Sequence, residues 1–158
     1  MISITGRIVG GQETLQKFAA LEARVRDDLK HTIHLTAEAL KTKVQGKLSG
    51  PVLKAPTGAL KGSINVKDDF TTNSITSSVG VNLGSIPYAR IHEYGGTILP
   101  KNGPYLVFKT PDGAWHKVTR VVMPERSYLR SSLAEMAPFI EKAIRASLKK
   151  SIKAAGFK

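Results

Sequence analysis

Residues 13–47 read ETLQKFAALEARVRDDLKHTIHLTAEALKTKVQGK, and this stretch decides the fold. Its apolar residues recur three, four or seven positions apart, which places them on one face of a helix. Glu13 suits the positive end of that helix, and Gly46, Gly50 and Pro51 predict where it stops. We therefore expect one long helix whose buried stripe comprises Leu15, Phe18, Val25, Leu29, Ile33, Ala37, Leu40 and Val44, widened by Leu21 and Leu35.

Strands are predicted on both sides of this helix. Residues 2–9 alternate apolar and polar positions and predict a strand within an N-terminal segment, residues 1–12. A loop rich in glycine and proline, with room for one helical turn, follows the helix. Residues 62–124 then form a β-rich middle. Its predicted parts are strands at 64–70 and 75–82, a helical turn at 85–96 closed by two glycines, a hairpin-like pairing of 97–100 with 105–108, a turn at 110–113 and a strand at 115–123.

The C-terminal region, residues 126–155, is predicted to be helical. A short helix over 126–136 precedes a clearer amphipathic helix over 138–155, with Pro138 tolerated in its first turn. One face of this region carries Leu133, Met136, Ile140, Ile144, Leu148 and Ile152, and the opposite face carries Lys142, Arg145, Lys149 and Lys153. The whole chain, residues 1–158, is thus predicted to be a single α+β domain, a mostly antiparallel sheet packed by one long N-terminal helix and a C-terminal amphipathic helix.

Charge and composition narrow the possible functions. The net charge is +12, and residues 101–158 carry 12 Lys/Arg against 4 Asp/Glu, which favours an acidic partner or nucleic acid. The basic face of the C-terminal helix is either a solvated face or a contact for DNA or an acidic partner; both interpretations stay open. There are no cysteines, no membrane-length apolar run and no signal peptide, so we expect a soluble intracellular protein without membrane partners.

No catalytic, cofactor-binding or metal-binding constellation is predicted. Gly10-Gly11 lacks the rest of a phosphate-binding motif and predicts a plain turn. His31 and His34 are three apart on the long helix, but no third ligand matches their spacing. His92-Glu93 has no accompanying nucleophile and is expected to be structural. We therefore expect a protein that is not an enzyme and holds no cofactor.

Three segments, in order, resemble a known family. They are APTGALKGSI at 55–64, VGV at 79–81 with PYARIHEYGGT at 87–97, and MPERSYLR at 123–130, before a closing amphipathic helix. Together they resemble the virion-morphogenesis and tail-completion proteins of tailed phages, and the doubled glycine and inserted hairpin are more similar to the Mu-like branch. Two positions depart from the family. Ser127 stands where proline is frequent, so a looser turn is expected, and Glu125 stands where a small residue is usual and could pair with Arg126 or Arg130.

The resemblance implies a structural role in the neck or tail of a virion, assembled in the cytoplasm of the host bacterium. Copies of the chain would form a ring, with a hexamer expected, at the head-proximal end of the tail. Its neighbours would be the tail tube or tail terminator protein and the head–tail connector proteins, with DNA contacted only non-specifically through the lumen. The alternative is a basic accessory protein that binds nucleic acid non-specifically.

Seven residues are candidates for a subunit or partner interface: Tyr88, Arg90, Glu93, Tyr94, Arg126, Tyr128 and Arg130. Tyrosines bury a ring while keeping a hydroxyl at a polar edge, and arginine forks suit carboxylates. Glu93 is a candidate acceptor, either within the subunit or across a ring contact. An intramolecular corner with solvated charges is the alternative. Lys142, Arg145, Lys149 and Lys153 are the candidates to face DNA or an acidic partner.

Overall fold

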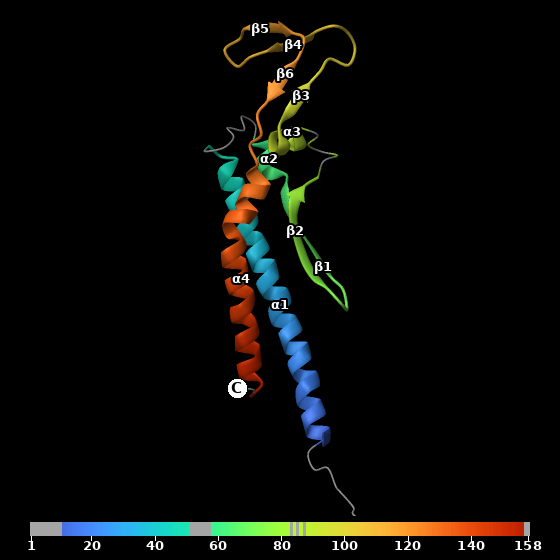
Figure 1. The fold of residues 1–158 in the computed structure, drawn as a ribbon, viewed down its shortest axis with the longest axis vertical. Helices are drawn as coiled ribbons and strands as arrows, with labels where there is room; N and C mark the ends of the chain where they lie inside the picture. The colour runs from blue at the N-terminus through green and yellow to red at the C-terminus, as the bar shows by residue number, and fades with distance from the viewer. Residues whose placement is uncertain (1–10, 51–57, 83, 85, 87, 157–158) are drawn as a thin grey trace, which may run out of the picture. The chain divides into compact units, whose positions relative to one another are not determined.

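The computed structural model describes residues 11–50, 58–82, 84, 86 and 88–156. The chain has two long helices, and the short antiparallel strand pairs come between them in the sequence. This composition confirms the predicted α+β class. The strand predicted at residues 2–9 lies outside the described residues. The elements are α1 (Gly11–Lys47), α2 (Ala59–Gly62), β1 (Ile64–Phe70), β2 (Ile75–Val81), α3 (Ala89–Tyr94), β3 (Gly96–Ile98), β4 (Leu106–Lys109), β5 (Trp115–Val118), β6 (Val121–Met123) and α4 (Tyr128–Ala154), as drawn in Figure 1.

The chain divides into two compact units, each of which is described here by itself. Unit 1 takes its described residues from the ranges 1–38, 68–77 and 137–158, and unit 2 from 39–67 and 78–136. Helices α1 and α4 and the β1–β2 hairpin each contribute residues to both units. Among the described residues, no helix has an apolar stretch long enough to cross a membrane.

Helix α1 begins two residues before the predicted start and ends at the predicted residue. Its last turns are buried in unit 2, where Val44 is fully covered. The predicted buried stripe is wrong near the start of the helix and at Leu35, because Leu15, Phe18 and Leu35 are 70 %, 52 % and 52 % exposed. Near the start the reason is the length of α4, which ends at Ala154, so the first turns of α1 have no helix beside them among the described residues.

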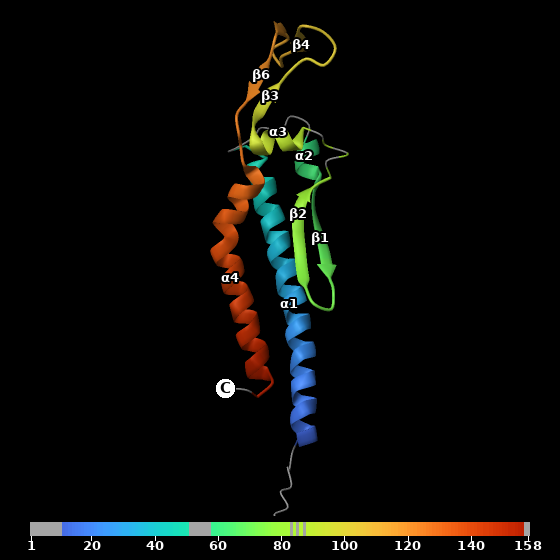
Figure 2. The same cartoon turned by 45° about the vertical axis from the view of Figure 1, so that its right-hand side comes forward.

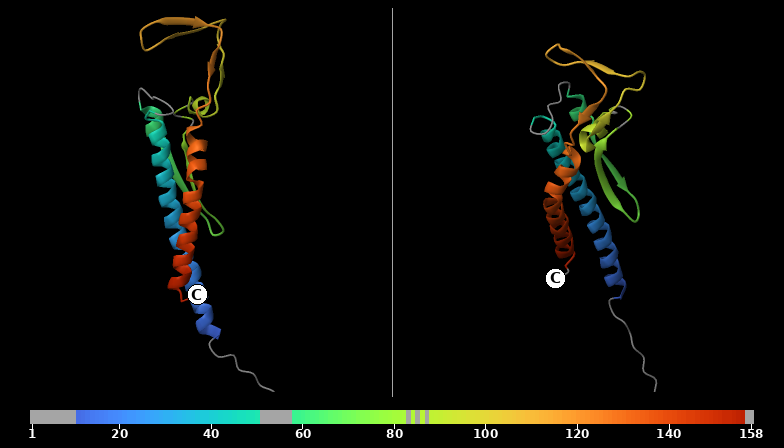
Figure 3. Two further views of the ribbon diagram at one scale, coloured as in Figure 1. Left: turned by 60° about the vertical axis from the view of Figure 1, so that its left-hand side comes forward. Right: turned by 45° about the horizontal axis from the view of Figure 1, so that its top comes forward.

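In unit 1, α1 and α4 run antiparallel and side by side (Figure 3). The hydroxyl of Ser151 donates to Asp28 Oδ2 at 2.6 Å, and that of Thr32 donates to Ser147 Oγ at 3.0 Å. Small side chains at this contact let the two backbones approach, and each buried hydroxyl has a partner. Short polar contacts therefore help to hold the two helices together in unit 1.

The prediction of two C-terminal helices is wrong. Helix α4 is one continuous helix of 27 residues with Pro138 inside it. Proline removes only the hydrogen bond to the carbonyl of Ala134, and both residues are exposed, so water can bond that carbonyl instead. The predicted buried face is also wrong at both ends, because Leu133 and Ile152 are exposed.

The strands pair in three separate two-stranded ladders. β1 and β2 form the predicted hairpin (Figure 2), closed by the Thr71 N–H donating to the Ser74 carbonyl at 2.9 Å. The predicted pairing of 97–100 with 105–108 is wrong: β3 pairs with β6, and β4 with β5. The predicted strand at 115–123 is accordingly two strands, while the predicted turn at 110–113 is confirmed by the bond from Thr110 N–H to the Ala114 carbonyl. Strands of three or four residues carry too little alternation to specify their partners.

The core of unit 2 is small and aliphatic, apart from one tyrosine. Half-buried apolar residues from β2, α4 and the segment before α3 pack against it. Its buried members come from α1 and the residue after it, from α2, β1, α3 and the first turn of α4: Leu40, Val44, Leu48, Leu60, Ile64, Ala89 and Tyr128.

Candidate functional site

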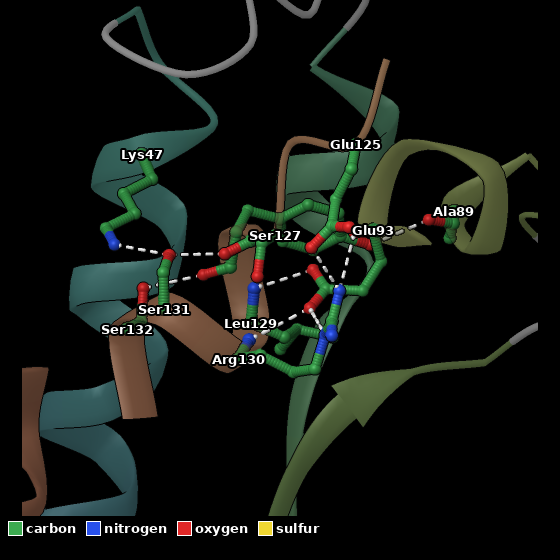
Figure 4. Close-up of polar contacts among 10 residues, drawn as sticks. Lys47, Ala89, Glu93, Glu125, Ser127, Leu129, Arg130, Ser131 and Ser132 are labelled. Atoms are coloured by element: carbon green, nitrogen blue, oxygen red, sulfur yellow. Dashed lines mark hydrogen bonds and ion pairs between the residues drawn. The ribbon is translucent and has the colours of Figure 1, made fainter. Parts of the chain in front are cut away.

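The three sequence segments that carry the family resemblance meet at one place in unit 2. Leu60 and Ile64 from the first segment, Ala89 from the second and Tyr128 from the third are all buried in the same core. We call the part built by α3 and residues 123–130 the α3–α4 corner (Figure 4). Residues that lie tens of positions apart in the sequence thus form one structural feature.

Glu93 is the buried charge of this corner. Its side chain is only 3 % exposed. One carboxylate oxygen accepts the Leu129 N–H at 2.8 Å, and the other accepts the Arg130 N–H at 2.9 Å and the Arg130 Nε–H at 3.2 Å. The two N–H groups belong to the first turn of α4 and have no acceptor within the helix. Glu93 therefore caps a helix that begins 35 residues further along the chain.

A carboxylate at this position also matches the positive end of the α4 dipole. The residue just before α4, Ser127, has a φ of 44°. Its N–H donates to the Glu93 carbonyl at 3.1 Å, and the Arg126 N–H donates to the His92 carbonyl at 3.1 Å. Proline at 127 would have a φ near −65° and no N–H, so the family's frequent proline does not fit this turn. The turn is held by backbone bonds and is not loose.

Arg130 lies across the outer side of the corner. Its guanidinium bonds Glu125 Oε1 at 2.6 Å as well as Glu93, and it lies over the Tyr94 ring at 4.5 Å from the centroid. The structure thus has Glu125 paired with Arg130, one of the two partners expected. Glu93 accepts bonds within the chain, which is the intramolecular alternative of the two that the sequence left open.

Tyr128 anchors α4 to α3. Its ring is 1 % exposed, and its hydroxyl donates to the Ala89 carbonyl at 3.2 Å. Burial, and then the charge of Glu93, raise the pKa of Tyr128 to about 12. The hydroxyl therefore remains a donor at any ordinary pH.

Gly95 is required where α3 ends. Its φ is 67°, and a Cβ atom placed there would lie 2.7 Å from the Glu125 nitrogen and 2.9 Å from the Met123 carbonyl oxygen. Those are backbone atoms that cannot rotate away. Both the conformation and the space at this position require glycine, as the predicted glycine closure of the helical turn implied.

A second polar cluster in unit 2 was not predicted. The carboxylate of Glu135 on α4 forms ion pairs with two lysines of α1, Lys43 Nζ at 2.6 Å and Lys47 Nζ at 2.7 Å. Lys47 Nζ also donates to Ser131 Oγ at 2.6 Å. The hydrogen bonds from the two lysines lower the pKa of Glu135 to about 2. Periodicity marks these residues only as the polar faces of two helices, so the sequence held no sign that the faces meet.

Four of the seven candidate interface residues present side-chain surface. Tyr88, Arg90, Tyr94 and Arg130 are exposed, whereas Arg126 is half-buried and Glu93 and Tyr128 are buried. A hollow of about 370 Å³ opens beside the corner. Its lining combines buried and half-buried apolar residues with exposed arginine and tyrosine side chains: Val81, Ala89, Arg90, Glu93, Tyr94, Tyr128, Leu129 and Arg130. Such a surface suits contact with a protein partner.

The basic face of α4 belongs to unit 1 and is exposed at all four predicted positions, Lys142, Arg145, Lys149 and Lys153. Arg145 is paired with Glu141 at 2.7 Å, so its charge is partly balanced. A shallow hollow of about 430 Å³ is lined by residues of this face, including Lys142 and Lys149.

The histidines form no metal or catalytic constellation among the residues described. No cluster of three or more metal-ligating side chains occurs there. His34 bonds Asp68 at 2.7 Å, but Ser77 donates to that same carboxylate and not to the imidazole, so His34 is not placed to take the proton of this hydroxyl. Burial, and then the charge of Arg126, lower the pKa of His92 and favour its neutral form.

Comparison of this chain with models of protein families, with curated proteins and with solved structures finds no match in any of the three.

Proposed function

We propose that this chain is a structural subunit of a tailed bacteriophage or prophage, a tail-completion or neck component that forms a ring at the head-proximal end of the tail and takes part in head–tail joining. The observation that carries the proposal is the α3–α4 corner. The three segments that resemble the family converge in the core of unit 2 on which this corner is built, with Leu60, Ala89 and Tyr128 in that core and Glu93 capping α4. Segments that resemble a family in sequence and also build one feature support a shared fold.

Exposed apolar side chains support assembly with identical copies or tail proteins. Leu15 and Phe18 on α1 are more than half exposed, and a hollow of about 470 Å³ lies beside Phe18, Val25 and Ile75 in unit 1. Contiguous apolar surface on a protein commonly marks a contact site. In the proposed ring, identical head-to-tail contacts would cover such surfaces around a closed circle. The tail tube or terminator and the connector proteins would bind the two sides of the ring, and DNA would pass through it.

The hollow at the α3–α4 corner is the surface we assign to the subunit contact. Arg90 is exposed at its rim, and Tyr94 is 56 % exposed. Arginine and tyrosine are enriched at interface cores, where the guanidinium finds carboxylates and the ring buries area at small entropic cost. Glu93 and Tyr128 hold this surface in place from inside the subunit.

Imaging of the purified chain tests the proposal. Mass photometry and negative-stain microscopy over a wide concentration range should find annuli of one copy number. Arg90→Glu should abolish the annuli while leaving the helical circular dichroism signal unchanged. Lys67→Glu, which makes the same charge change at another exposed position of unit 2, should retain them. A chain that stays monomeric at every concentration, or rings equally sensitive to both variants, would contradict the assignment.

The second candidate is a basic accessory protein that binds nucleic acid non-specifically. The exposed lysines of the α4 basic face favour it. This function predicts duplex binding that weakens steeply with salt, loss of binding in a Lys142→Ala, Lys149→Ala double variant, and no ring.

A further inference from the structure

The β4–β5 hairpin has two faces of different chemistry. Its register places Leu106 opposite Val118 and Phe108 opposite His116, so these four side chains share one face. On that face the Phe108 and His116 rings stack at 5.6 Å, and His116 Nε2 lies 3.1 Å from Thr110 Oγ1. The contacts of Phe108 and His116 on this face are made within the hairpin.

The opposite face alternates aromatic, apolar and basic side chains. The register pairs Val107 with Lys117 and Lys109 with Trp115, and Tyr105 shares their parity. Trp115 is 72 % exposed and Tyr105 47 % exposed, and the Lys117 ammonium lies 4.2 Å from the Tyr105 ring centroid. We call these five residues the aromatic–basic face. They offer two ring surfaces with a cation beside each.

The charge around the aromatic–basic face is one-sided. Residues 96–123 contain four basic residues, Lys101, Lys109, Lys117 and Arg120, against the single acid Asp112. Asp112 lies in the turn at the tip, where its carboxylate accepts the Ala114 N–H at 3.4 Å. The face is therefore complementary to a negatively charged partner with flat groups that can stack on the rings.

We propose that the aromatic–basic face binds single-stranded nucleic acid, with bases stacking on Trp115 and Tyr105 and phosphates contacting Lys109 and Lys117. Base stacking on aromatic rings combined with basic side chains along the backbone is how unpaired strands are held without sequence preference. A duplex keeps its base faces stacked inside and offers only edges to these rings. The proposal does not rest on the ring assembly.

Two other occupants fit the face less well. A hairpin that inserts into a membrane surface would carry its apolar residues at the tip, whereas this tip is the polar turn Thr110 to Ala114 with Asp112 in it. A dry protein interface needs a contiguous apolar patch. Here Lys117 lies opposite Val107 and Lys109 lies opposite Trp115, so the apolar surface is interrupted.

Trp115 is the only tryptophan of the chain, so its emission reports directly on this face. Titrating the full chain with a 20-nucleotide oligothymidylate should quench the emission, whereas inorganic polyphosphate should not. In anisotropy measurements with a labelled oligothymidylate, Trp115→Ala should weaken binding by about 5- to 140-fold, the loss of one stacked base. Lys109→Ala with Lys117→Ala should lower the slope of log affinity against log salt by about 1.4, the value for two lost phosphate contacts.

A charge-matched control is Lys61→Ala with Lys67→Ala, which removes two exposed lysines of α2 and β1 and should keep the quenching and the affinity. Equal losses in the two lysine pairs, or a Trp115→Ala variant that binds like the parent, would overturn the proposal. So would duplex binding as tight as that of the single strand. A blue shift on phosphatidylserine vesicles without quenching by the oligonucleotide would assign the face to a membrane. A blue shift that grows with protein concentration and with salt, again without that quenching, would assign it to a second copy of the chain.

Discussion

Glu93→Ala should strongly destabilise the chain, because it removes the buried carboxylate of the α3–α4 corner. The carboxylate is 3 % exposed and accepts the N–H groups of Leu129 and Arg130. A hydrogen bond to a charged group contributes about 1.5–3 kcal/mol to stability. At the low end of that range, losing the bonds from both N–H groups should lower the free energy of unfolding by roughly 3–4 kcal/mol. For a chain of this length that corresponds to a fall in the melting temperature of roughly 6–15 °C.

Thermal unfolding followed by circular dichroism measures the loss, and hydrogen exchange locates it. The amides of Leu129 and Arg130 should exchange faster in the Glu93→Ala variant even below the melting temperature, because their acceptor has gone. Glu125→Ala is the matched control, since it removes the other carboxylate on Arg130 but is itself half-exposed. Exposed ion pairs contribute little, so its melting temperature should stay near that of the parent. If the two variants melt alike, the cap on α4 does not hold this corner together.

Three further changes test other parts of unit 2. Gly95→Ala should lower the free energy of unfolding by more than about 3 kcal/mol, because the residue has a positive φ and its Cβ would clash with backbone atoms. Gly46→Ala is the control: it lies in a helix with open space around it, so the change should be neutral or stabilising by up to about 1 kcal/mol. Thermal melts compare the two variants. Tyr128→Phe should cost about 0.5–1.5 kcal/mol in urea unfolding, the value of one buried hydroxyl bond, and equal stability would contradict the bond to Ala89. The pKa of Glu135 is about 2 in the fold and 4.5 in an unfolded chain. The contribution of this carboxylate to the free energy of unfolding is therefore complete above pH 4.5 and is lost as the pH falls toward 2. Glu135→Gln should flatten the melting temperature over that pH window, and an unchanged slope would contradict the lysine contacts.

Long, strongly periodic elements were predictable from the sequence. The stripe of residues 13–47 predicted α1 to within two residues, because many apolar positions agree on one helical period. The β1–β2 hairpin followed from alternation on both sides of a polar turn, and the glycine closure of α3 followed from Gly95 and Gly96. Burial along α1 was less predictable, because Leu15 and Phe18 fit the stripe but lie beyond the end of α4.

The errors arose where distant parts of the chain decide the local structure. The partners of β3 and β4 depend on tertiary position, since three or four residues do not specify a register. Pro138 suggested a helix boundary, but an exposed proline removes one bond from a helix that packing on both sides maintains. At the candidate site, the sequence singled out Glu93 and Arg130. It could not assign Glu93 to the cap, because a helix normally takes its capping side chain from the residue just before it.

The Glu93 cap also bears on the order in which the chain is made. Helix α4 leaves the ribosome after α3, so its capping carboxylate, 36 residues upstream of Leu129, has emerged well before it. The first turn of α4 therefore gains its acceptor only once the intervening strands have folded back and brought α3 to it. Closing that loop has an entropic cost that local helix formation lacks. The start of α4 is accordingly expected to become ordered together with the β3–β6 ladder and not before it.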